Sequence, residues 1–331
     1  MPDAFFLAVI TIAVALIFDF VNGFHDAANS ISTIVATRVL TPLQAVLMAS
    51  FWNFIGAFVF GVAIAKTVGS GIIVKEAAVI EVILAALIGA IAWNIVTWRL
   101  GIPSSSSHAL IGGLVGAAIS FGGAATIQFS GLNKTLIFIV LAPLLGLVGS
   151  IIFTVGVFSV SRKARPVSVN SWFKRLQLIS ASWYSLGHGT NDAQKTMGII
   201  AAVLFSSGFI DSFRIDIWVI LAAHAAIALG TFAGGWRIVR TMGGRLTKLR
   251  PVDGFCAESG GALILLGTAH YGIPVSTTHV IASSIMGVGL TKRVNSVRWN
   301  VARNIVVAWL ITIPMSAFFA AVSHLLIVKL L

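Results

Sequence analysis

The sequence predicts an all-α integral membrane protein made of two inverted repeats, with broken helices and re-entrant hairpins. Three observations predict this fold. Apolar residues make up 58% of the 331 residues and charged residues only 10%, and the mean hydropathy is +1.00. Short basic clusters separate the long apolar runs. Two motifs each occur twice, in the same order along the chain.

The composition excludes a soluble globular domain and a disordered chain. Soluble domains carry about a quarter charged residues, and disordered chains are poor in apolar ones. In a bilayer, only helices and closed barrels satisfy every backbone hydrogen bond. The apolar runs are too long and too uniform for barrel strands, so we expect helices. At about 20 residues per span, the chain has room for roughly ten to twelve membrane segments.

The positive charge of the chain indicates its orientation in the membrane. The 22 lysines and arginines give a net charge of +12 and gather near residues 162–175, 237–250 and 292–303. Basic loops between apolar runs mark the cytoplasmic side, so we expect no nucleic-acid partner. This rule places the N-terminus outside, residues 162–175 inside and the C-terminus outside. The two halves of the chain then begin on opposite faces of the membrane.

The repeated motifs indicate a duplication. The first motif reads GIPSSSSHALIGGLVGAAI at 101–119 and GIPVSTTHVIASSIMGVGL at 272–290. The second reads NGFHDAANS from Asn22 and HGTNDAQKT from His188. A duplication whose halves start on opposite faces is an inverted repeat, a common plan of secondary transporters. The expected division is 1–161 for the first repeat, 162–175 for a short basic cytoplasmic linker and 176–331 for the second repeat.

The two GIPxS segments predict an anion site. Glycine and proline interrupt each apolar run, and the helix that restarts there presents unpaired N–H groups beside three hydroxyls. In one copy these hydroxyls would equally fit ordinary helix caps, but two symmetric copies favour ligand binding. Whether residues 78–121 and 256–290 form re-entrant hairpins or full spans stays open, because both return the chain to the same side. The expected anion ligands here are Ser105, Ser106, Ser107, Ser276, Thr277 and Thr278.

The second motif places ionisable residues at membrane depth, where they are costly and mark functional sites. Asp26 and Asp192 can coordinate an alkali cation such as sodium or carry a coupling proton. Lys195 stands where the first repeat has Asn29, and its ammonium would pair with an aspartate, attract an anion or extend to the surface. The remaining candidates are Asn22 and Asn29 for the cation, and the amides of Asn191 and Gln194 for the anion.

Four histidines flank the same motifs. Histidine titrates near neutral pH and can relay protons, and a neutral histidine can equally hydrogen-bond a helix end. Together with Lys195, we treat them as candidates for a proton relay or for a charge partner. They are His25, His108, His188 and His279.

Two other functional classes were weighed against a carrier. An intramembrane protease would use the aspartate pair but gives the hydroxyl-rich hairpins no role, and the chain contains neither GxSxG nor HExxH. An anion channel would need a ring of charges or carbonyls, which a twofold duplication does not supply. We therefore expect a transporter and no enzyme, with no cofactor other than the coupling ion.

The motifs at 22–30 and 188–196, together with the twin segments GIPSSSSH and GIPVSTTH, resemble the inorganic phosphate transporter (Pit) family along essentially the whole chain. The resemblance implies uptake of inorganic phosphate, free or as a neutral metal complex, in symport with a proton or sodium ion by alternating access. A branch of this family carries sulfate. The resemblance also implies a homodimer and a multi-pass location in the cell membrane of a bacterium or archaeon. Gln194 and Lys195 depart from the Ala-Asn of other members.

Overall fold

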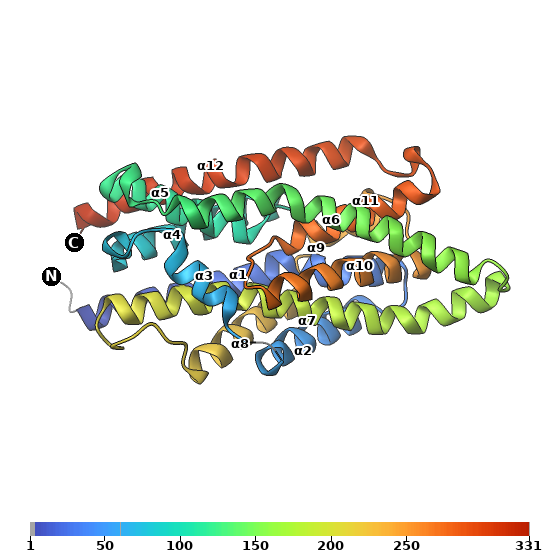
Figure 1. Ribbon diagram of the computed structural model, residues 1–331, viewed down its shortest axis with the longest axis horizontal. Helices are drawn as coiled ribbons and strands as arrows, with labels where there is room; N and C mark the ends of the chain where they lie inside the picture. Colours follow the sequence, from blue (N-terminus) through green and yellow to red (C-terminus); the bar gives the residue numbers. More distant parts are fainter. Residues whose placement is uncertain (1–3, 60, 331) are drawn as a thin grey trace.

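The computed structural model describes residues 4–59 and 61–330, and these form helices and loops without a β-strand (Figure 1). The expected all-α fold is confirmed. The first half holds α1 (Ala4–Ala36), α2 (Pro42–Ile55), α3 (Ala63–Gly71), α4 (Ile80–Leu100), α5 (Ser106–Gly122) and α6 (Phe129–Ser161). The second half holds α7 (Pro166–Ser206), α8 (Ile217–Ala233), α9 (Trp236–Arg240), α10 (Pro251–His270), α11 (Thr277–Lys292) and α12 (Trp299–Leu330). Short 3-10 turns lie at Gly56–Phe58, Lys75–Ala77, Ala124–Thr126 and Val294–Ser296, and a π turn at Thr241–Arg245.

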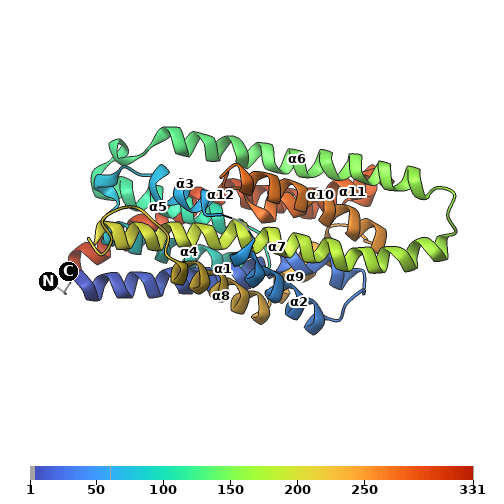
Figure 2. The same cartoon turned by 60° about the horizontal axis from the view of Figure 1, so that its bottom comes forward.

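The long helices run along the long axis of the molecule in opposed pairs. In Figures 1 and 2, α1 starts at the end where both termini lie, whereas α7 starts at the far end. Helices α6 and α12 are opposed in the same way. The helix pair α4–α5 occupies the half nearer the termini, and the pair α10–α11 occupies the other half. The turns that join these pairs therefore meet toward the middle of the molecule.

Within residues 4–59 and 61–330, four helices are long and apolar enough to cross a membrane by themselves, namely α1, α4, α6 and α12. Two bent pairs, α2 with α3 and α8 with α9, raise this number to as many as six if each pair is one span. The bend between α8 and the segment that follows it is 59°. The predicted number of ten to twelve membrane segments is larger because it includes the arms of the two hairpins. That number stays a prediction.

The expected linker at 162–175 is mostly helical. Helix α6 continues to Ser161 and α7 already begins at Pro166, so only residues 162–165 connect them. Proline at the first position of a helix has a backbone angle suited to that position and loses no intrahelical hydrogen bond there. The basic residues of the expected linker thus lie partly on the first turns of α7.

Buried apolar side chains form two clusters with the repeated polar motif between them. On α1, Ala8 to Phe18 belong to one cluster and Ala28 to Ile34 to the other. On α7, Phe173 to Tyr184 and Ala193 to Val203 divide in the same way. The polar stretches around Asp26 and Asp192 therefore lie where the two apolar clusters meet.

Matched glycines allow the helices that carry these motifs to pack closely on their neighbours. A Cβ at Gly23 would lie 2.2 Å from the backbone oxygen of Ile227 on α8, and one at Gly189 would lie 2.5 Å from that of Asn53 on α2. Backbone atoms cannot move aside as a flexible side chain can. Glycine in both copies of the motif is thus explained by packing alone.

We predict that Gly189→Val lowers the stability of the folded protein, because overpacking of this kind costs about 1–3 kcal/mol. Thermal denaturation in detergent, followed by size exclusion, measures the shift. The control is Gly156→Val on α6, where a new Cβ meets no atom within 4 Å. Equal melting temperatures for the two variants would show that α7 and α2 are not in close contact.

Candidate functional site at the hairpin turns

The two hairpin turns have the same local structure. Gly101 and Gly272 end α4 and α10 with φ values of 66° and 63°, a left-handed conformation that glycine adopts without strain. Ser105 then caps α5 by accepting the amide of His108 at 3.2 Å, and Ser276 caps α11 by accepting that of His279 at 3.2 Å. Each turn therefore presents a helix N-terminus with its hydroxyls, as the sequence predicts.

Asp26, on α1, is the carboxylate of the first motif and is only 2% exposed. His25 Nδ1 lies 2.5 Å from its Oδ1, and Thr278 donates a hydrogen bond to Oδ2 at 3.3 Å. His25 Nε2 lies 3.1 Å from the hydroxyl of Thr97 and 3.3 Å from that of Ser104 in the first hairpin turn. The aspartate of the first half thus contacts the hairpin of the second, and its histidine contacts the hairpin of its own half.

Asp192, on α7, is the carboxylate of the second motif and is fully buried. Its Oδ2 accepts a hydrogen bond from Thr277 at 3.1 Å and lies 3.2 Å from His188 Nε2. Its Oδ1 accepts a hydrogen bond from the ammonium of Lys195. Oppositely charged groups that are both desolvated attract strongly, so this pair holds the aspartate in place.

The two aspartates form one cluster. Ligand atoms of Asp26, His188 and Asp192 all lie within 4.8 Å of one another. Asn29 links the cluster to α11 by donating hydrogen bonds to Thr277 at 3.2 Å and to Thr278 at 2.9 Å. Two carboxylates this close repel each other in a medium of low dielectric constant, and a bound cation or proton relieves that repulsion. The oxygen-rich ligand set suits a hard cation such as sodium.

Lys195 connects both hairpin turns to the aspartates. Besides Asp192, its ammonium donates hydrogen bonds to the hydroxyl of Ser107 and, at 3.2 Å, to the backbone oxygen of Val275. Ser107 lies at the start of α5, and Val275 lies in the nonhelical segment before α11. A single side chain therefore joins the turns of the two hairpins. Of the three roles that the sequence left open for Lys195, the structure shows the contact with an aspartate.

Several predicted ligands have a buried side-chain oxygen that makes no hydrogen bond to the described protein. The hydroxyl of Ser106 has no hydrogen-bond partner among the described residues. The same holds for the side-chain oxygens of Asn22, Asn29 and Asn191. Buried polar groups are nearly always paired, so these atoms are available to a ligand. The hydroxyl suits an anion and the three amide oxygens suit a cation.

The remaining predicted residues contact protein groups in this conformation. Gln194 accepts the backbone amide of Ile64 at 2.9 Å and so caps α3, while the amide nitrogen of Asn191 donates to two backbone oxygens at 3.0 Å. The ring centroids of His108 and His279 lie 4.5 Å apart. The anion role of the two amides and the relay role of these histidines stay predictions.

A buried polar cluster around Glu258, on α10, was not among the predicted site residues. Glu258 accepts hydrogen bonds from Thr33 at 2.6 Å, Ser180 at 2.5 Å and Gln177 at 2.9 Å. Tyr184 also donates to the backbone oxygen of Thr277 at 2.8 Å, which positions the second turn. Glu258 carries the same signal as the aspartates, because it is an ionisable residue within an apolar run.

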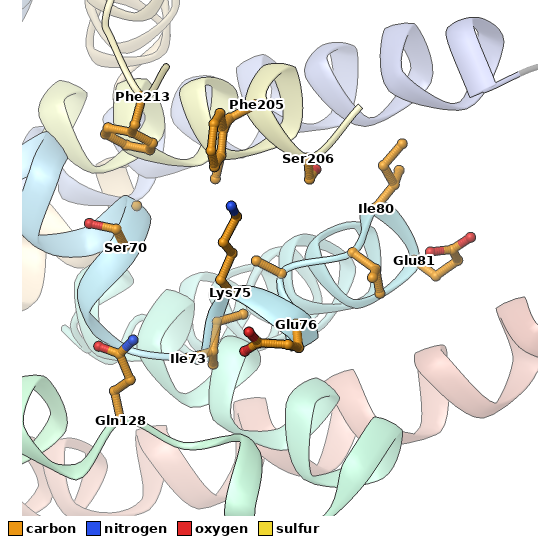
Figure 3. Close-up of a pocket in the computed structure, with 14 residues that line it drawn as sticks. Ser70, Ile73, Lys75, Glu76, Ile80, Glu81, Gln128, Phe205, Ser206 and Phe213 are labelled. Carbon is orange, nitrogen blue, oxygen red and sulfur yellow. The ribbon is translucent and has the colours of Figure 1, made fainter. Parts of the chain in front are cut away.

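A cavity of about 720 Å³ lies apart from this cluster (Figure 3). The nitrogen of Lys75 points toward the ring of Phe205, 4.8 Å from its centroid, and Glu76 and Glu81 line the same cavity. None of the lining residues belongs to the two repeated motifs. The chemistry that the motifs predict is therefore concentrated at the hairpin turns.

Comparison with known proteins agrees with this geometry. A model of the phosphate transporter family matches residues 22–320. A probable low-affinity inorganic phosphate transporter of Rhizobium meliloti (strain 1021) is 56% identical over 97% of this chain and 96% of its own. One of Bacillus subtilis (strain 168), described in the same words, is 43% identical over 97% of each chain.

A solved structure described as the sodium-dependent phosphate transporter matches the fold with a TM-score of 0.88 at 25% identity. The match covers 98% of this chain and 100% of that one. The resemblance seen in the motifs is thus confirmed, and the relatives are transporters and not enzymes. A family match over most of the sequence, with relatives at 56% and 43% identity, means that this chain belongs to the phosphate transporter family.

Proposed function

We propose that this protein takes up inorganic phosphate across the cell membrane, in symport with a sodium ion or a proton. The observation that carries the proposal is the contact of both hairpin turns with the paired aspartates, through Lys195 and the threonines of α11. Phosphate is favoured over sulfate because the relatives named above are phosphate transporters. The homodimer and the neutral metal–phosphate complex stay predictions.

The repeats that we propose correspond to α1–α6 and α7–α12, which keeps the expected division near residues 162–165. Each half has the same three features in the same order. A bent helix pair follows the first long helix, a hairpin is broken at a glycine, and the last helix contains a proline, which is Pro143 in α6 and Pro314 in α12. The opposed directions of α1 and α7 in Figure 1 support an inverted relation between the halves. Hairpin turns near the middle of the molecule support re-entrant hairpins over full spans.

In this proposal, phosphate binds between the two hairpin turns. The hydroxyls at the start of α5 and α11 donate hydrogen bonds to its oxygens, and the helix N-termini add positive potential. Neutral donors of this kind replace water around an anion without burying a second full charge. The unpaired hydroxyl of Ser106 is the donor that this conformation leaves free.

The coupling cation binds at the aspartates in this proposal. Asp26 and Asp192 share it, with the free amide oxygens of Asn22 and Asn29 as additional ligands. The name of the structural relative supports sodium, whereas a proton is the alternative because Asp26 hydrogen-bonds a histidine, a side chain that can carry one. Cation and anion then stabilise each other in one site, which makes their binding mutually dependent.

The burial of the cluster supports alternating access in this proposal. Asp26, Asp192 and Ser106 are each no more than 2% exposed, so substrate reaches them only after part of the protein moves. Transporters with inverted repeats achieve this by rocking one group of helices against the other.

Uptake of phosphate by reconstituted vesicles under imposed sodium or pH gradients, with sulfate as competitor, tests the identity of both the coupling ion and the transported anion. Uptake unaffected by either gradient would contradict symport.

Replacing either aspartate removes one ligand of the coupling cation. We predict that Asp26→Asn and Asp192→Asn each weaken gradient-driven phosphate uptake by a factor on the order of 5–150, the usual size of coupling between two sites. Radiolabelled uptake in vesicles measures the change, and the control is Asp211→Asn, at an exposed position between α7 and α8. Normal transport in both aspartate variants would remove the cation site from this position.

Ser106 tests the anion site without disturbing a helix cap. Ser106→Ala removes a hydroxyl that no protein group uses, so folding should be unaffected. A hydrogen bond to a charged group contributes about 1.5–3 kcal/mol, so the apparent affinity for phosphate should fall by about tenfold or more. Ser159→Ala, on the exposed surface of α6, is the matched control. If Ser106→Ala leaves the affinity unchanged, phosphate binds elsewhere.

A further inference from the structure

Asp26 and Asp192 form a close pair of carboxylates, and the ammonium of Lys195 binds one of them. We propose that Lys195 is a tethered cation that occupies a place which would otherwise hold a mobile coupling ion. The transporter then moves one mobile cation fewer per phosphate than a chain with a neutral residue at this position. This inference rests on the proposed function, because it concerns the cation that accompanies phosphate.

The internal repeat shows what Lys195 replaces. The first motif has Asn29 three residues after Asp26, and the second has Lys195 three residues after Asp192. Asn29 donates to the hydroxyls of Thr277 and Thr278 and keeps its side-chain oxygen free for a ligand. Lys195 has no oxygen to offer and brings a charge instead. The first half of the site therefore offers a free oxygen to a mobile cation, whereas the second half carries a positive charge of its own.

The surroundings of the lysine nitrogen are those of a bound cation. Its three neighbours are a carboxylate oxygen of Asp192, the hydroxyl of Ser107 and the backbone oxygen of Val275. Carboxylates, hydroxyls and carbonyls of broken helices are the groups that bind sodium in transporters of this architecture. The ammonium thus occupies a position that an alkali ion with the same ligands would take.

The donor count argues against direct binding of phosphate by Lys195. An ammonium has three N–H groups and no acceptor. In this conformation all three have protein oxygens as partners. Lys195 is also only 2% exposed. Its contribution to the anion is therefore the electrostatic field of a fixed positive charge, while the hydrogen bonds come from the serines and threonines.

The first aspartate has no tethered cation of this kind. The groups that hydrogen-bond Asp26 are His25 and Thr278, and Lys195 donates to Asp192. His25 is a positive partner of Asp26 only when its ring is protonated, and a buried carboxylate without a partner of opposite charge is costly. In this proposal the mobile cation is the counter-charge of Asp26, whose ligand atom lies within 4.8 Å of one of Asp192.

The test compares wild-type protein with Lys195→Asn, which copies the first motif into the second. Both are reconstituted in vesicles, and the sodium, protons and phosphate taken up are measured together under imposed gradients. We expect the number of cations per phosphate to rise by one in Lys195→Asn, with a steeper dependence of uptake on cation concentration. The matched control is Lys329→Asn, at the exposed end of α12, for which the ratio should not change.

A purely structural lysine would give a different result. If Lys195 only holds α7 to the hairpins, Lys195→Asn would lower the melting temperature and leave the ratio of cation to phosphate unchanged. That result would overturn the proposal. So would a folded Lys195→Asn protein that takes up no phosphate at any sodium concentration or pH, because a mobile ion would then be unable to replace the ammonium.

A second variant covers the case in which Lys195→Asn does not fold. Lys195→Met combined with Asp192→Asn removes both charges, so no buried charge is left unpaired. We expect slower phosphate uptake with the same number of cations per phosphate as in the wild type, because the mobile cation binds at Asp26. If the double variant took up one cation fewer per phosphate than the wild type, Asp192 would have bound a mobile ion of its own, contrary to the proposal. Absence of gradient-driven uptake in the wild-type protein would instead refute symport itself.

Discussion

The close approach of two buried carboxylates is the constraint on which the rest of this structure depends. Asp26 and Asp192 come from helices that run in opposite directions, and their ligand atoms lie within 4.8 Å in a setting nearly free of solvent. Such a pair is stable only when positive charge and hydrogen-bond donors surround it. The lysine, the two histidines and the hydroxyls of α11 surround the pair, and in the proposed function a coupling ion adds further positive charge.

The hairpins explain why this arrangement can also accept an anion. Each turn combines a left-handed glycine, a serine cap and a helix that starts at the level of the aspartates. The same hydroxyls that donate to the carboxylates can donate to phosphate, so the anion and the two aspartates share hydrogen-bond donors. Movement of one hairpin thus changes both sites, which is the physical basis of coupling in this account.

Much of this was predictable from the sequence, because duplication marks equivalent positions twice. The helical class and the helix breaks at the two GIP segments were expected from the composition and the motifs. The helical start of α7 at Pro166 and the capping role of Gln194 were not, since both depend on which groups lie nearby in three dimensions. The partner of Lys195 was equally undetermined, because three alternatives satisfied the same sequence pattern.

The position of the transported anion is the most direct test of the central claim. Arsenate has the shape and charge of phosphate, and its arsenic atom can be located by anomalous X-ray scattering in crystals grown with it. The account predicts an arsenic peak between the starts of α5 and α11, adjacent to Ser106 and the paired aspartates. A peak confined to the cavity beside Lys75, or to any position away from both hairpin turns, would contradict it.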